Sequence, residues 1–321
     1  MFKDVKEYIN KCDVCKAYKH SNSAPIGLMT NPKLVNYPMT MLSIDIIGPL
    51  PKSYSGHINI LSVVDVFTKF CWIFPLYQAT TKAIIKLLEK EIFLKFGCPK
   101  IIICDNGRQF TSKIFKDFIK DYNIPKLFYN TLYTPQNNPV ERFNKTIETC
   151  IACYVDTDHR TWSRFLPHIQ AAINGTVNLV TGYTPNFLMF GREIYLDGSL
   201  YKFSSISDPS EITISSRSEY SQLLSNLEDI FAKTVANLAK SYKKNASYYN
   251  SKRKVISYNV GDVVWRRNFV QSNAPYFFSA KLAPKFVKCK IVEKISDNVY
   301  LLKDLNKNTS GRFHVKDILK I

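Results

Sequence analysis

The sequence predicts an α/β core with a mixed sheet, followed by a long helix and a small β-barrel. In residues 41–155, β-branched apolar segments come first and then alternate with segments of helical periodicity, an order typical of a mixed sheet flanked by helices. In residues 220–249, apolar residues recur at helical spacing. Residues 251–321 alternate β-branched and polar positions around Gly-Asp turns, as small barrels do.

Each element of the core is expected from a local pattern. The predicted strands are short apolar runs at residues 41–47, 58–66, 70–76, 100–104 and 127–129. The predicted helices, with apolar residues three or four apart, cover residues 80–96, 110–122 and 138–155. Gly97 is a stop signal after the first helix, and Pro139 suits the first turn of the third.

The charge of the chain indicates its class of partner. The 321 residues contain 44 Lys and Arg against 26 Asp and Glu, a net charge of +18. With 45% hydrophobic residues the chain can bury a core, so this charge does not indicate disorder. A strongly basic folded chain most often binds nucleic acid. No run approaches the length of a membrane span and the start lacks a signal-peptide pattern, so we expect an intracellular protein without a membrane partner.

The basic residues are concentrated near the end of the sequence. Residues 231–321 carry 19 Lys and Arg against 5 Asp and Glu, a net +14. Trp265, Arg266 and Arg267 cluster in a strand-like segment there and are predicted to contact DNA, with a merely solubilising surface as the alternative. The short basic runs at 243–244 and 252–254 are consistent with nuclear import.

Two pairs of cysteines need separate interpretations. Eight cysteines in an intracellular chain of this size favour reduced thiols over a disulfide framework. Cys12 and Cys15 precede basic residues and have the spacing of half a zinc site, although a structural zinc usually needs four ligands and only His20 lies nearby. Cys150 and Cys153 lie in an apolar helical pattern and are expected in the core.

Three acidic residues in different settings are the candidate catalytic groups. Asp45 interrupts an apolar strand, Asp105 closes another strand before an Asn-Gly turn, and Glu141 falls in the first turn of a helix. Thirty-five residues separate Asp105 from Glu141. A fold that gathers three carboxylates offers the oxygen ligands that divalent cations such as Mg²⁺ prefer, and two such ions can assist phosphoryl transfer. Asp65 is expected to be a turn acid instead.

The motifs around these acids resemble those of retroviral and retrotransposon integrases, in particular the gypsy class. They are an Asp before Gly-Pro, an Asp-Asn-Gly-x-x-Phe turn, and Pro-Gln-x-Asn-x-Val-Glu-Arg-x-Asn at a helix start. The resemblance implies a ribonuclease H-like core with Asp45, Asp105 and Glu141 as ligands of two Mg²⁺ or Mn²⁺ ions. It also implies that DNA is contacted by Gln136, Asn137, Asn138, Arg142, Asn144 and Lys145.

The same resemblance implies a domain plan. Residues 1–20 would be the remnant of a zinc-binding module, in which Cys12 and Cys15 form a partial site, and 21–40 a linker. Residues 41–195 would be the catalytic core, 196–250 a linker and helix, and 251–321 an SH3-like basic DNA-binding domain.

The function implied is metal-dependent 3′-end processing and strand transfer of element DNA into target DNA. The expected partners are double-stranded DNA and further copies of the chain, with no small-molecule substrate. The expected location is the nucleus, after a cytoplasmic particle stage. Two alternatives stay open: a catalytically silent or host-adopted remnant that binds DNA, and a ribonuclease H-type nuclease.

Overall fold

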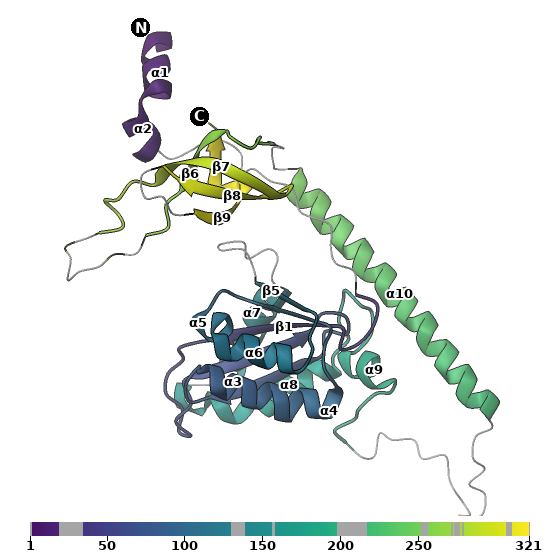
Figure 1. The fold of residues 1–321 in the computed structure, drawn as a ribbon. Helices are drawn as coiled ribbons and strands as arrows, with labels where there is room; N and C mark the ends of the chain where they lie inside the picture. Colours follow the sequence, from purple (N-terminus) through teal and green to yellow (C-terminus); the bar gives the residue numbers. More distant parts are fainter. Residues whose placement is uncertain are drawn as a thin grey trace, which may run out of the picture. The chain divides into compact units, whose positions relative to one another are not determined.

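The computed structural model describes residues 2–18, 35–129, 139–155, 158–197, 217–251, 256–270, 272, 277, 279–305 and 310–320. The chain forms two compact units (Figure 1). One unit is Lys33–Tyr242, and the other combines Met1–Pro32 with Lys243–Ile321. None of the described helices combines the length and the hydropathy that a membrane span requires.

The Lys33–Tyr242 unit is built on a mixed five-stranded sheet, as predicted. The strand order is β3-β2-β1-β4-β5, with β1 antiparallel to β2 and parallel to β4. The strands are β1 (Met41–Ile47), β2 (Asn59–Asp65), β3 (Cys71–Leu76), β4 (Ile101–Cys104) and β5 (Lys126–Tyr129). Every residue of β2 is buried because both faces of the sheet are covered.

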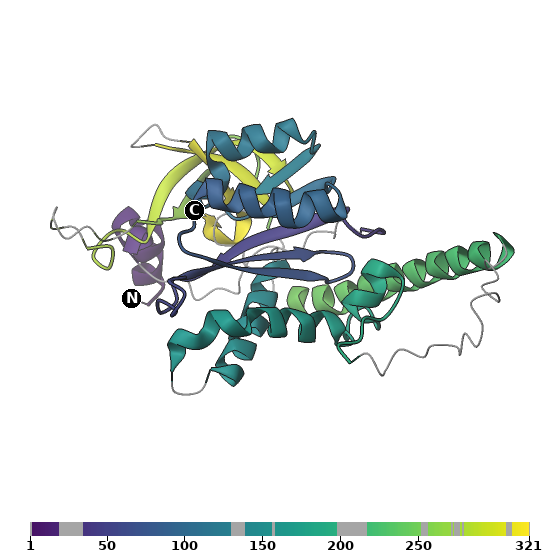
Figure 2. The ribbon, with the colours of Figure 1, turned by 90° about the horizontal axis from the view of Figure 1, so that it is seen from below.

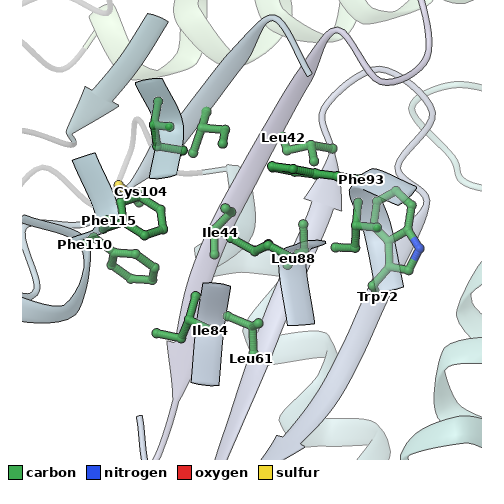
Figure 3. Packing of buried hydrophobic residues seen from close by; sticks show 14 of the residues in the cluster. Leu42, Ile44, Leu61, Trp72, Ile84, Leu88, Phe93, Cys104, Phe110 and Phe115 are labelled. Atoms are coloured by element: carbon green, nitrogen blue, oxygen red, sulfur yellow. The ribbon is translucent and has the colours of Figure 1, made fainter. Parts of the chain in front are cut away.

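Helices cover the two faces of this sheet (Figure 2). On one face lie α3 (Thr81–Leu87), the π-helical η1 (Leu88–Phe93), α4 (Leu94–Phe96), α5 (Arg108–Thr111) and α6 (Lys113–Asp121). On the other lie α7 (Pro139–Tyr154), η3 (His159–Thr161) and α8 (Trp162–Gly175), with α9 (Pro185–Phe190) packed against α8. The apolar side chains of the first face form the core drawn in Figure 3, including Leu42, Ile44, Ile84, Leu88 and Phe115.

The strand β1 shows how the sequence divides the two cores. Ile44 packs into the cluster of Figure 3, whereas Ile47 packs against residues of α7 and α8 on the opposite face. Successive side chains of a strand point to opposite faces, so the odd-numbered Asp45 faces α7. The fold therefore fixes the face on which this carboxylate is presented.

Asp65 is a turn acid, as expected. Its carboxylate is fully buried and accepts hydrogen bonds from the backbone N–H and the hydroxyl of Thr68, at 2.9 and 2.6 Å. It closes the turn between β2 and β3, in which Lys69 has a left-handed backbone (φ 66°). The position of Asp65 is therefore explained by the hairpin turn.

The helix α10 (Arg217–Asn250) packs in part against the core sheet unit. The Phe231 ring lies 5.4 Å from the rings of both Tyr37 and Phe67, and the Asn237 amide donates to the Thr181 carbonyl at 3.0 Å. These contacts anchor its first part within the Lys33–Tyr242 unit.

The second unit contains an antiparallel five-stranded sheet of the SH3-like kind. Its order is β10-β6-β7-β8-β9, built from β6 (Val263–Arg267), β7 (Phe286–Ser296), β8 (Val299–Asp304), β9 (Ser310–His314) and β10 (Ile318–Lys320), with η7 (Val315–Asp317) before the last strand. Tyr258, Cys289 and Tyr300 are part of its core. The helices α1 (Phe2–Lys11) and α2 (Asp13–Tyr18) belong to this unit. Lys288 of β7 pairs with Asp13 at 3.1 Å, and the Lys285 N–H donates to the Ala17 carbonyl at 2.8 Å.

Candidate active site

The strands β1 and β4 bring Asp45 and Asp105 to the same end of the sheet. These strands are parallel neighbours, with Met41 opposite Ile101 and Ser43 opposite Ile103. Asp45 and Asp105 each lie two residues beyond the last of these pairs. Because adjacent strands lie about 4.8 Å apart, the register places the two acids side by side where β4 ends.

The buried thiol of Cys104 lies near both carboxylates. Burial raises the pKa of Cys104 to about 12, and the negative charges of Asp105 and Asp45 add to this rise. Both carboxylates therefore lie within electrostatic range of one buried sulfur atom. Further negative charge at this point is costly, whereas a cation would be stabilised.

A tight turn orients Asp105. Its Oδ1 accepts a hydrogen bond from the Gly107 N–H at 3.0 Å, an Asx-turn that directs the chain from β4 into α5. A Cβ at position 107 would lie 2.9 Å from that same oxygen, so glycine allows the close approach. Asp105 makes no ion pair among the described residues.

Asn144 connects Asp45 to the helix α7. Its side-chain amide donates to Asp45 Oδ2 at 2.8 Å, while its carbonyl oxygen accepts from the buried Ser62 hydroxyl at 2.7 Å. The other carboxylate oxygen, Oδ1, accepts the Ile46 N–H at 2.9 Å. Asn144, predicted to contact DNA, thus holds the carboxylate of Asp45.

Sequence reasoning did not find this positioning role, nor any role for Ser62. The available signal was the spacing of three residues between Glu141 and Asn144, which puts both on one helix face. The partner across the sheet becomes visible only when the strands are paired, because Ser62 lies directly opposite Asp45.

Glu141 lies in the first turn of α7, as predicted, about one helical turn before Asn144. Its side chain and that of Arg142 lie outside the described residues, as do Gln136, Asn137 and Asn138 entirely. Lys145 is exposed on α7. The roles predicted for Glu141, Arg142, Lys145 and the loop residues stay predictions.

The arrangement fits hard divalent cations. Asp45 and Asp105 supply carboxylate oxygens, both side chains are partly accessible to solvent, and α7 directs the position of Glu141 toward the same end. No cluster of three potential His, Cys, Asp or Glu ligands occurs among the described side chains, a set that leaves out Glu141. Two neighbouring carboxylates could hold such ions, and the ions would align a phosphodiester for in-line displacement.

Cys12 and Cys15 lie close together at the junction of α1 and α2. The Cys15 N–H donates to Cys12 Sγ at 3.5 Å, and bonding to Cys15 lowers the pKa of the Cys12 thiol. His20 lies outside the described residues, so the described part of the chain offers zinc only these two sulfur atoms here. The partial zinc site stays a prediction.

The basic cluster of the barrel is less exposed than the sequence suggested. The Trp265 side chain is only 6% exposed, and Arg266 pairs with the buried Asp304 at 3.2 Å. Both side chains thus take part in the packing of the barrel, and the contact of Trp265 and Arg266 with DNA stays a prediction. Arg267 is exposed, and its contact with DNA stays a prediction.

Comparisons with known proteins identify the sheet unit. Residues 36–130 match the family described as "Integrase core domain". The chain is 30% identical to the retrovirus-related Pol polyprotein from transposon 412 of Drosophila melanogaster, in an alignment of 323 residues that covers 100% of this chain and 25% of that protein. It is 35% identical over 200 residues to the Pro-Pol polyprotein of feline foamy virus, covering 61% of this chain and 17% of the relative.

Among solved structures, a chain of the simian T-cell lymphotropic virus intasome is similar with a TM-score of 0.56 and 13% identity, covering 100% of this chain and 91% of that one. At that identity the likeness supports the fold. The chain spans at most about a quarter of the length of the two Pol relatives above. Residues 36–130 thus match the integrase core domain, and the chain is similar to the Pol polyproteins of retrotransposons and retroviruses.

Proposed function

We propose that this chain is a metal-dependent DNA nucleotidyltransferase that carries out 3′-end processing and strand transfer, the two steps of DNA integration. The observation that supports this most is the position of Asp45 and Asp105, each two residues beyond the last pair of the parallel strands β1 and β4, within a segment that matches the integrase core domain. The bond from Asn144 to Asp45 adds α7, and with it the backbone of Glu141, to the same site.

In this proposal Asp45, Asp105 and Glu141 hold two Mg²⁺ or Mn²⁺ ions. When bound, such ions activate the attacking oxygen and stabilise the leaving one. The protein positions the ligands: Asn144 and the Ile46 N–H each fix one oxygen of Asp45, and the Gly107 N–H fixes one oxygen of Asp105. The two strands carry the pair on a rigid sheet, so little reorganisation is needed as the reaction proceeds.

The proposed sequence of reactions has two displacements at phosphorus. In the first, water attacks a phosphodiester near the 3′ end of element DNA and the bond from that phosphorus to the 3′-oxygen breaks. The 3′-oxygen takes up a proton to become a hydroxyl, and the short strand departs with the phosphate on its 5′ end. In the second, that 3′-hydroxyl attacks a phosphodiester of target DNA, and the broken strand leaves with its own 3′-hydroxyl. One phosphodiester forms as another breaks, so strand transfer needs no external energy source.

The proposed partners are DNA and further copies of the chain. A net charge of +18 suits phosphate neutralisation, and residues 231–321 carry +14 of it. The similar viral chain is described in an intasome, and two DNA ends must be joined in one event, so we propose a multimer. We further propose a nuclear site of action, on the basic runs at 243–244 and 252–254 alone.

Joining of a labelled oligonucleotide duplex to plasmid DNA tests this proposal. The native chain is expected to produce joined products with Mg²⁺ or Mn²⁺ and none with EDTA. Salt-sensitive DNA binding without joining would support the alternative of a silent remnant. Cleavage of the RNA strand of an RNA–DNA hybrid, without joining, would support the ribonuclease H alternative.

A further inference from the structure

The loop between β1 and β2 forms a rigid platform beside an open cavity. Ser53 and His57 are joined by two hydrogen bonds, N–H to carbonyl at 2.9 Å and N–H to hydroxyl at 3.0 Å. The loop is also fastened to the segment before α8, because Tyr54 bonds Asp158 at 2.6 Å and the Trp162 indole donates to the Pro51 carbonyl at 2.8 Å. The platform is therefore preorganised rather than free to collapse.

The cavity has a volume of about 530 Å³, and its lining combines an aromatic face, a cation and polar groups. The lining includes Lys52, Ile58, Tyr77, Gln78 and Thr80, and it contains no acidic residue. The Tyr77 side chain is 64% exposed, although apolar and aromatic side chains of the same sheet are buried. Such a lining suits a flat, polar-edged, negatively charged ligand.

The ring of Tyr77 is held in place by its neighbours. It packs against the imidazole of His57, with ring centroids 4.3 Å apart and ring planes tilted by 33°, and burial lowers the pKa of His57. Gly56 has a left-handed backbone (φ +85°), and a Cβ there would lie 3.3 Å from the Tyr77 ring. One face of Tyr77 is thus supported by the platform, which preorganises the ring for stacking.

The cavity lies at the end of the sheet that carries the catalytic acids. Ile58, which lines the cavity, immediately precedes β2. It lies four residues before Ser62, the residue opposite Asp45, which corresponds to about 13 Å along the strand. That distance corresponds to about four nucleotides of duplex rise. The lining residues Leu76 and Ala83 pack on the α3 face of the sheet, whereas Asp45 faces α7. A DNA strand whose phosphate reaches Asp45 and Asp105 therefore reaches this cavity by passing around the end of the sheet.

We propose that this cavity, lined by Tyr77, Lys52 and Gln78, binds an unpaired nucleobase of the DNA substrate near the reacting phosphate. The base stacks on the exposed face of Tyr77, the Gln78 amide offers a donor and an acceptor to its edge, and the Lys52 ammonium neutralises a phosphate. Arg160 adds a second cation to the adjacent surface. Its guanidinium lies 4.4 Å from the centre of the Tyr54 ring, and its backbone N–H donates to Asp158. This inference deepens the proposed function and rests on it for the identity of the ligand as DNA.

The test measures binding of the full chain to two fluorescent DNA duplexes of the same sequence, one blunt and one with a three-nucleotide single-stranded overhang. The native chain is expected to bind the overhang duplex about five- to 100-fold more tightly, the usual effect of one stacked base. Tyr77→Ala should abolish this preference without weakening binding of the blunt duplex. Tyr77→Phe, which keeps the ring, should retain it.

Two results would overturn the proposal: equal affinity of the native chain for both duplexes, or a Tyr77→Ala variant that keeps the preference. Equal weakening of both duplexes by Tyr77→Ala would also contradict it, because the cavity would then not recognise the unpaired base. The outcome is separable from the proposed catalysis. Asp105→Asn should keep the overhang preference while losing strand joining, and a native chain that shows the preference but never joins DNA would refute the catalysis alone.

Discussion

Replacing Asn144 by alanine is expected to weaken both the fold and the site. The substitution removes two hydrogen bonds, to Asp45 at 2.8 Å and from Ser62 at 2.7 Å. The fully buried Ser62 hydroxyl is then left with a long 3.5 Å contact to the Asp45 carbonyl. Leaving such a group without a good partner costs about 1–3 kcal/mol, and the better helix propensity of alanine returns about 0.6 kcal/mol. We therefore expect a net loss of about 1–2 kcal/mol in the free energy of unfolding.

The effect on activity is expected to be larger than this loss of stability suggests. Residues that orient metal ligands typically contribute about tenfold to 100-fold to metal affinity or activity. The assay is strand joining as a function of Mn²⁺ concentration, with urea unfolding of the same variants. Joining by Asn144→Ala should need more metal, while Lys145→Ala, an exposed neighbour on the same helix, should leave the metal requirement unchanged.

A double-mutant cycle with Ser62→Ala refines this test. Because Ser62 and Asn144 share a hydrogen bond, the two substitutions should be non-additive by about 0.5–1.5 kcal/mol. Strictly additive effects, or an Asn144→Ala variant with native stability and a native metal requirement, would refute the assigned positioning role.

Two further predictions concern buried charges. Burial raises the pKa of Asp65 to about 6, against the opposing hydrogen bonds of Thr68 and an unfolded value of about 3.9. The folded state thus binds the proton of Asp65 more tightly than the unfolded state does, so the free energy of unfolding should fall as pH rises from about 4 to about 6. Urea unfolding at several pH values should show this fall in the native chain and not in Asp65→Asn. A variant with the native pH profile would contradict this prediction. In the barrel, Arg266→Ala should lower stability by about 1.5–3 kcal/mol because it removes a charged hydrogen bond to the buried Asp304. Arg267→Ala should instead keep the melting temperature and lower the salt dependence of DNA binding by about one charge, and the reverse pattern would refute the roles expected of the two arginines.

The strands and the layered plan were readable from the sequence because their causes are local. The predicted strand at residues 41–47 coincides with β1, since an apolar run between a turn and Gly-Pro is specified by adjacent residues. The helix predicted over 80–96 is present, yet it contains a π-helical segment at Leu88–Phe93. Apolar spacing cannot reveal that local widening, because the same side chains still reach the core.

The features that the sequence did not reveal depend on contacts between distant segments. Trp265 and Val264 are adjacent in β6 and both buried, so strand alternation alone does not show that Trp265 is covered. The ion pair of Arg266 depends on Asp304, 38 residues away, and the bond of Asn144 depends on a strand 99 residues earlier. Candidate acids were visible in their motifs, but the residues that hold them required the fold.

Strand joining by four matched acid-to-amide variants tests whether Asp45, Asp105 and Glu141 are the metal ligands of the proposed active site. Asp45→Asn, Asp105→Asn and Glu141→Gln change the proposed metal ligands, and Asp65→Asn changes an acid that Thr68 holds in a hairpin turn. All four should bind DNA like the native chain. Joining should be lost in the first three variants and kept in Asp65→Asn. Joining that persists in any of the three, with the protein folded and bound to DNA, would contradict it.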